Sequence, residues 1–67
     1  MVDTNKIKGK MVEKGYTQKT LAKKLNLHYM TVFAKLRDGT WTLKEVEQLM
    51  ELLDLEVETF IERSHNG

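Results

Sequence analysis

The chain has 67 residues, of which 40% are hydrophobic and 31% charged, and it contains no cysteine. A chain of this length forms one domain, over residues 1–67, with a small core, since small proteins bury only about 60% of their unfolded surface. Without cysteine, disulfides and thiolate metal sites are excluded, so packed helices must supply the stability, and we expect no cofactor and no metal.

Charge is divided unevenly along the chain, although the net charge is only +1. Residues 1–42 hold nine basic and three acidic residues, a net charge of +6. Residues 43–67 hold two basic and seven acidic residues, a net charge of −5. This division favours one side that faces a polyanion, but two solvated faces of an ordinary helical protein would give the same pattern.

No apolar run approaches the roughly 20 residues of a membrane-spanning helix. The N-terminal segment is interrupted by lysines and has no apolar signal-peptide core. We therefore expect a soluble, cytoplasmic protein that does not associate with a membrane.

Apolar residues recur at helical spacing, and no segment alternates in the manner of a strand. The pattern predicts helices at about 4–14, 18–25, 29–37 and 43–53, with a short fifth helix at about 57–63. Residues suited to helix starts precede them: Asp3 or Thr4, Thr17, His28 and Thr42.

The C-terminal segment is expected to close the core. This role falls to Leu55, Val57, Phe60 and Ile61, and the same cluster is a candidate for a dimer interface. Residues 64–67 are expected to fray.

The most informative segment is 17–39, where two short helices are joined by a tight turn that contains Asn26. In a helix-turn-helix arrangement of this kind the second helix enters the DNA major groove. Val32 and Leu36 would anchor that helix to the core and leave its opposite side free.

Three stretches carry a family resemblance. The run Thr17-Gln18-Lys19-Thr20-Leu21-Ala22-Lys23-Lys24-Leu25-Asn26-Leu27 resembles the "TQ-x-x-LA-x-x-LG-hydrophobic" signature of the Cro and phage-repressor-like (XRE-type) helix-turn-helix family. Residues 31–39 resemble its recognition helix and following turn, and 41–46 resemble the "F-T-L-x-E-hydrophobic" entry to its fourth helix. The resemblance covers about residues 5–62.

The resemblance implies an all-α, compact four- to five-helix bundle of the lambda-repressor-like type. It also implies a phage repressor or Cro-like transcriptional regulator that binds a double-stranded DNA operator, often as a homodimer. Such a regulator would work in the cytoplasm of a bacterial host cell, at the nucleoid.

Eleven residues are predicted to contact DNA. The base-reading set is His28, Tyr29, Met30, Thr31 and Ala34, and the phosphate-contacting set is Thr17, Gln18, Lys19, Lys35, Arg37 and Thr40. Tyr29, Met30 and Ala34 replace polar or basic readers of the family, which favours contact with thymine methyl groups over bidentate hydrogen bonds. Trp41 is expected to anchor the edge of the core, and Phe33 has no assigned role in DNA binding.

Nothing in the sequence resembles a catalytic site, so we predict a non-enzyme without a small-molecule substrate. His28 has no Asp, Glu, Ser or second His placed to work with it, and Glu47 and Glu51 are typical of solvent-exposed helix charge. Two alternatives remain. The same fold would serve a protein-interaction adaptor or anti-repressor through an apolar patch at Tyr29, Met30 and Phe33, or an antitoxin-type regulator that binds both DNA and a toxin.

Overall fold

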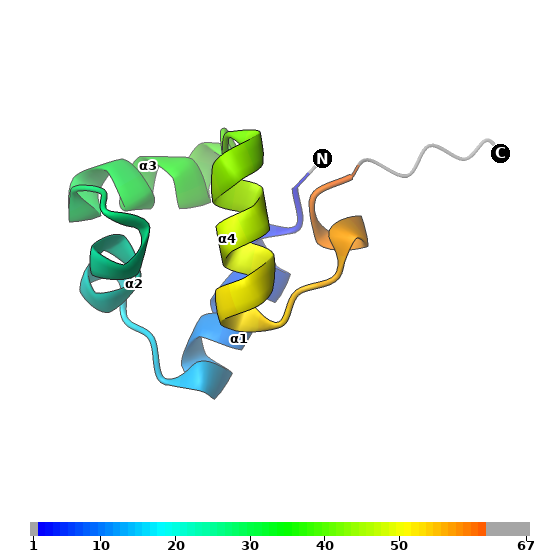
Figure 1. The fold of residues 1–67 in the computed structure, drawn as a ribbon, viewed down its shortest axis with the longest axis horizontal. Helices are drawn as coiled ribbons and strands as arrows, with labels where there is room; N and C mark the ends of the chain where they lie inside the picture. The colour runs from blue at the N-terminus through cyan, green and yellow to red at the C-terminus, as the bar shows by residue number, and fades with distance from the viewer. Residues whose placement is uncertain (1, 62–67) are drawn as a thin grey trace, which may run out of the picture.

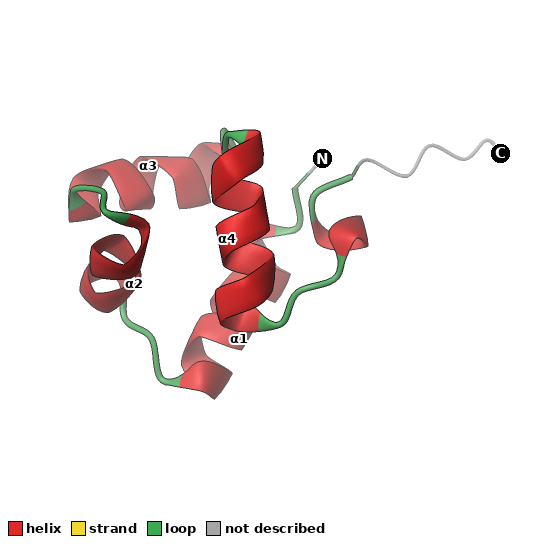
Figure 2. Cartoon of the chain, viewed as in Figure 1, coloured by secondary structure: helices red, strands yellow, loops and turns green. Residues whose placement is uncertain are grey.

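The computed structural model describes residues 2–61, which form four α-helices and a short 3₁₀ helix, with no strand among them (Figure 1, Figure 2). The elements are α1 (Thr4–Lys14), α2 (Gln18–Leu25), α3 (Tyr29–Asp38), α4 (Leu43–Leu53) and η1 (Val57–Thr59). The prediction of an all-helical fold is therefore confirmed for the part of the chain that the structure describes. The bounds of α1, α2 and α4 agree with the sequence prediction, and α3 is one residue longer.

Each α-helix begins at a residue whose side chain satisfies a free backbone N–H group. Asp3 accepts from the N–H of Lys6 at 3.1 Å. Thr17 and Thr42 each form a capping box, in which the cap side chain and the third helical residue bond to each other's backbone. Such caps are typically worth about 1 kcal/mol each, so the helix starts are encoded locally.

The core takes side chains from all four α-helices. Ile7, Leu21, Val32, Leu49 and Leu53 are the largest fully buried side chains, and burying one such side chain stabilises a fold by about 1.5–3 kcal/mol. The helix α2 packs on α3, whereas α1 packs on α4 and η1. In Figure 1, α2 and α3 lie on one side of α4 and η1 lies on the other.

The segment after α4 departs from the predicted fifth helix. The structure has a single 3₁₀ turn, Val57–Thr59, where the predicted helix was to begin. The carbonyl of Thr59 accepts a hydrogen bond of 2.7 Å from the backbone N–H of Asp3. This contact with the start of the chain engages a carbonyl that a continuing α-helix would use as an acceptor within its own backbone.

Core closure by the C-terminal segment is confirmed for two residues and wrong for two. Leu55 is buried and Phe60 packs against the core, but Val57 and Ile61 are exposed. A 3₁₀ turn has three residues per turn, so it does not align positions 57 and 61 on the core face as an α-helix would. Residues 62–67, including the end of the predicted helix and the predicted frayed tail, lie outside the described residues.

The described helices are short, and the longest have 11 residues. None of those within residues 2–61 has the length and apolar character that crossing a bilayer requires.

Candidate nucleic-acid interface

A three-residue turn holds α2 and α3 against each other. Asn26 adopts a left-handed conformation (φ 59°, ψ 45°) that ends α2, and asparagine tolerates this conformation better than most residues. The N–H of Leu27 then donates to the carbonyl of Ala22 at 2.9 Å. Ala22 is buried, and its small side chain suits the contact between the two helices. The turn therefore presents α3 in a fixed orientation relative to α2.

One side of α3 is open to solvent along its length. Val32 and Leu36 are buried on the inner side. Helical geometry gathers a second set of residues on the other side, which we call the outer face of α3: Tyr29, Met30, Phe33, Ala34 and Arg37. Tyr29, Met30 and Phe33 are 42%, 52% and 47% exposed. Thr31 is exposed beside this face, and Ala34 is partly buried.

Phe33 is the residue of the outer face to which the sequence prediction gave no role in DNA binding. It lies four residues after Tyr29 and three after Met30, so all three side chains are neighbours on one helix surface. The signal was present in this spacing. Its exposure was not evident from the sequence, because Phe33 directly follows the buried Val32 and phenylalanine is common in protein cores.

The imidazole ring of His28 caps the start of α3. The N–H of Met30 donates to its Nδ1 at 3.1 Å, so the neutral ring carries its proton on Nε2 and retains one donor. The ring also stacks on Tyr29, with centroids 5.0 Å apart and planes at 24°. His28 therefore orders the first turn of α3 and is itself exposed.

The start of α2 brings together three predicted phosphate contacts: Thr17, Gln18 and Lys19. The hydroxyl group of Thr17 is occupied by the N–H of Thr20, at 3.1 Å. The N–H groups of Gln18 and Lys19 lie in the first turn, where no intrahelical acceptor exists. The positive end of the helix dipole lies at the same place. These features form a surface suited to an anion next to the outer face of α3.

Lys19 connects this surface to α3. Its ammonium group lies 5.5 Å from the centroid of the Tyr29 ring, at cation–π distance. The first turns of α2 and α3 thus meet at one place, where a positive charge stands beside an aromatic ring.

Lys35 lies in a different environment from the one predicted. Its ammonium group is 2.9 Å from Oε1 of Glu45 and donates to the carbonyl of Thr40 at 3.0 Å. It also lies 5.9 Å from the centroid of the Trp41 ring. Only 16% of its side chain is exposed. Lys35 is therefore engaged at the corner between α3 and α4, on the side away from the outer face.

The same corner shifts the pKa of Glu45. Partial burial of the carboxyl raises this pKa, but the hydrogen bond from the Thr42 backbone and the contacts with Lys35 outweigh burial and lower the pKa below its ordinary value. Trp41 packs at the edge of the core, as expected from the sequence.

Arg37 is exposed, but its guanidinium group is paired. Nε and Nη2 donate to the two carboxylate oxygens of Asp38 at 2.9 and 3.0 Å. These hydrogen bonds lower the pKa of Asp38 and raise the pKa of Arg37. The positive charge of Arg37 is therefore offset by the negative charge of Asp38 beside it. Thr40, the last predicted phosphate contact, is exposed in the loop after α3.

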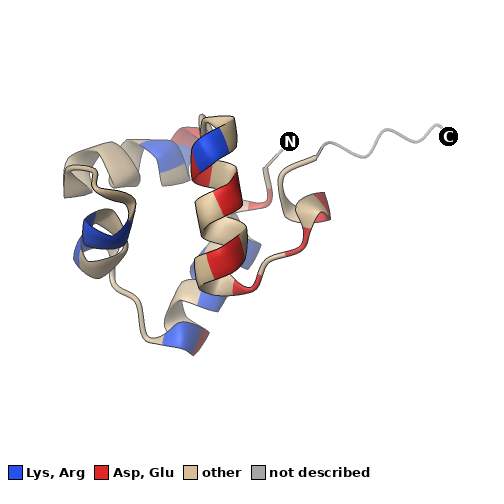
Figure 3. Ribbon diagram, in the orientation of Figure 1, with Lys and Arg blue, Asp and Glu red and all other residues tan. Residues whose placement is uncertain are grey.

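The basic and acidic halves of the sequence occupy different helices. Figure 3 shows Lys and Arg mostly on α1, α2 and α3, and Asp and Glu mostly on α4 and the segment that follows it. Asp38 is the acidic residue of α3. Among residues 2–61, the acidic residues of α4 and the segment after it therefore do not surround the first turns of α2 and α3.

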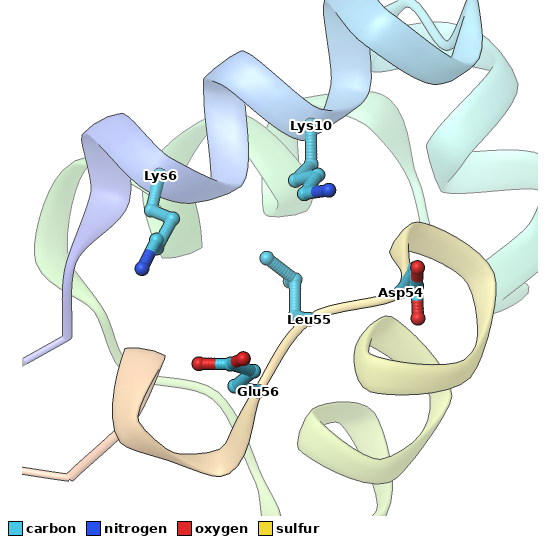
Figure 4. Close-up of a pocket in the computed structure, with 5 residues that line it drawn as sticks. All are labelled: Lys6, Lys10, Asp54, Leu55 and Glu56. Carbon is cyan, nitrogen blue, oxygen red and sulfur yellow. The ribbon is translucent and has the colours of Figure 1, made fainter.

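A pocket of about 360 Å³ lies elsewhere, between α1 and the segment that follows α4. Figure 4 shows Lys6 and Lys10 of α1 extending towards the segment that carries Leu55 and Glu56. Asp54 completes the lining, so two basic and two acidic side chains offset each other. Within residues 2–61, no three His, Cys, Asp or Glu side chains converge as metal ligands.

The fold and this surface define a small all-helical protein in which two short helices, joined by a tight turn, expose one face of the second. Over residues 1–65 the chain matches the model of a family described as "Protein of unknown function (DUF739)", and it belongs to that family. No curated protein and no solved structure matches the chain.

Proposed function

We propose that this chain is a sequence-specific, double-stranded DNA-binding transcriptional regulator of the phage repressor or Cro-like helix-turn-helix type. In this proposal α3 is the recognition helix and enters the major groove. The observation that carries the proposal is the exposed outer face of α3, which lies beside the start of α2. There the N–H groups of Gln18 and Lys19 have no acceptor within the helix, and the Lys19 ammonium group lies next to Tyr29. Such a protein is not an enzyme, and it acts in the cytoplasm, at the nucleoid of a bacterial host cell.

The proposed docking places the start of α2 on a phosphate ridge. The N–H groups of Gln18 and Lys19 and the Lys19 ammonium group meet phosphate oxygens there. The exposed residues of the first turns of α3, from His28 to Phe33, and the partly buried Ala34 then face base edges. Two copies in a homodimer would place their recognition helices about 34 Å apart, on a near-palindromic operator.

Lys35 has a positioning role in this proposal and does not contact a phosphate. Its bonds to Glu45 and Thr40 hold the end of α3 against the start of α4. The orientation of α3 relative to α4 depends on this corner. The path of the loop between these two helices, which would run beside the DNA, depends on it as well.

Selection of bound DNA from a random pool tests the proposal, followed by fluorescence anisotropy on the selected duplex at several salt concentrations. We expect one sequence, or a pair of related half-sites, to be enriched. Affinity should fall steeply with salt, because each neutralised phosphate contributes about −0.9 to the slope of log K against log salt. No enrichment, or a flat salt response, would contradict the proposal.

One observation favours a second candidate, a protein-interaction adaptor or anti-repressor. Tyr29, Met30 and Phe33 form an exposed apolar patch, and such patches often contact other proteins. The two candidates differ in the anisotropy measurement, because an adaptor would not bind duplex DNA even at low salt.

A further inference from the structure

The outer face of α3 offers few groups for bidentate hydrogen bonding to bases. Guanine is commonly read by Arg or Lys and adenine by Asn or Gln, because these side chains match two atoms of a base edge at once. Arg37 is the one residue of these types on the outer face. Its Nε and Nη2 already donate to the Asp38 carboxylate, at 2.9 and 3.0 Å. Hydrogen-bond readout of guanine or adenine is therefore poorly supported by this face.

Large apolar side chains occupy most of the same face. Tyr29, Met30 and Phe33 are each about half exposed, and their spacing makes them neighbours on the helix surface. The apolar group that base pairs present in the major groove is the C5 methyl of thymine. A flexible thioether beside an aromatic ring can adapt to such a methyl group and bury it.

The Tyr29 ring at the border of this apolar face is held in place by its neighbours, and a positive charge lies beside it. His28 stacks on one side of Tyr29, and the Lys19 ammonium group lies 5.5 Å from the centroid of the Tyr29 ring. A ring held in this way loses less freedom on binding. The positive charge at its border complements a phosphate ridge next to the groove floor, which favours DNA over an apolar protein surface as the occupant.

From these observations we infer that the outer face of α3 recognises thymine-rich half-sites through their 5-methyl groups. Met30 and Phe33 bury the methyl groups, and Tyr29 packs at the border of the contact. The inference rests on the proposed DNA-binding function and adds the chemical feature of the DNA that confers specificity.

Replacement of thymine by deoxyuridine in the selected duplex is the decisive experiment. Uracil keeps the hydrogen-bonding edge of thymine and lacks only the methyl group, and the protein is unchanged, so folding cannot confound the result. Anisotropy is measured for single replacements across each half-site. We expect two or more positions at which affinity falls about fourfold each, which is the effect of losing one buried methyl group.

Variants of the protein then assign the contacts. Met30→Ala and Phe33→Ala should bind thymine and uracil duplexes with nearly equal affinity at the position that each side chain contacts. Lys19→Ala should weaken binding to both duplexes by the same factor. Val12→Ala is the control, because it shortens an exposed apolar side chain on α1, outside the proposed contact, and it should retain the full preference for thymine. Circular dichroism checks that each variant is folded.

The outcomes distinguish this inference from the proposed function. Tight, sequence-selective binding that is unaffected by every uracil replacement would overturn methyl recognition and leave a DNA-binding regulator. A thymine preference that survives both Met30→Ala and Phe33→Ala would also overturn it, because the methyl groups would then be read elsewhere. No binding to any duplex would remove the proposed function, and methyl recognition with it.

Discussion

The ammonium group of Lys35 and the carboxylate of Glu45 lie 2.9 Å apart and join α3 to the first turn of α4. The same carboxylate oxygen accepts the N–H of Thr42 at 2.9 Å, so one glutamate completes a capping box and an interhelical ion pair. Both side chains are more than four-fifths buried. This corner holds the end of the proposed recognition helix.

Lys35→Ala should lower the free energy of unfolding by about 2 kcal/mol, since hydrogen bonds to charged groups contribute about 1.5–3 kcal/mol. Urea denaturation measures the change. A double-mutant cycle with Glu45→Ala should show a coupling of at least about 1 kcal/mol between the two residues. Arg37→Ala is the matched control, because its ion pair is exposed and should contribute little. Strictly additive effects of Lys35 and Glu45 would contradict the coupling.

Glu45 should also make stability depend on pH. Its folded-state pKa is lowered, so its contribution is fully present above the ordinary glutamate pKa of 4.5. The contribution should disappear as the pH falls from there through the folded-state value. We therefore expect the stability difference between the native chain and Glu45→Gln to be constant near neutral pH and to shrink in acid. A difference that grew on acidification would reverse the sign that we assign.

The cap of α4 gives a third prediction. Thr42→Ala removes the oxygen that accepts the N–H of Glu45 at 3.2 Å, and it should cost about 1 kcal/mol of stability. Thr42→Ser keeps the hydroxyl group and should cost less. Thr40→Ala, two residues earlier in an exposed loop, serves as the control and should change the urea midpoint little. Equal losses for all three variants would show that the hydroxyl group of Thr42 is not the stabilising group.

Asn26 gives a fourth prediction, from backbone conformation. Its φ of 59° is left-handed, and a side chain with a β-carbon costs roughly 1–2 kcal/mol there unless it is of a tolerant type. We expect Asn26→Ala to destabilise the chain by about 1 kcal/mol relative to Asn26→Gly, as measured by thermal or urea unfolding. If alanine proved as stable as glycine, the turn would not need a left-handed residue.

Much of this fold is predictable from local sequence signals. Thr17 and Thr42 identify the starts of α2 and α4, because a capping hydroxyl group acts within three residues. The left-handed residues Gly15 and Asn26 identify the ends of α1 and α2. Apolar spacing then gives the buried faces, including Val32 and Leu36 on α3.

The features that the sequence did not predict depend on contacts between distant segments. The bond from Asp3 to the Thr59 carbonyl joins two ends of the described chain, and it ends the 3₁₀ turn where a helix was expected. Periodicity contains no information about such a bond. From the sequence alone, Lys35 is expected to be a solvent-exposed lysine on a helix. Its partner Glu45 lies beyond the loop after α3, and only the folded structure brings the two side chains together.

The central claim is that the first turns of α2 and α3 form the surface that contacts DNA. Titration of the ¹⁵N-labelled chain with the selected duplex tests it most directly, with amide chemical shifts followed residue by residue. We predict that the largest changes fall at residues 17–19 and 28–34, while the amides of the acidic segment 54–58 change little. Changes concentrated on α4 and the 54–58 segment, with residues 28–34 unaffected, would contradict the claim.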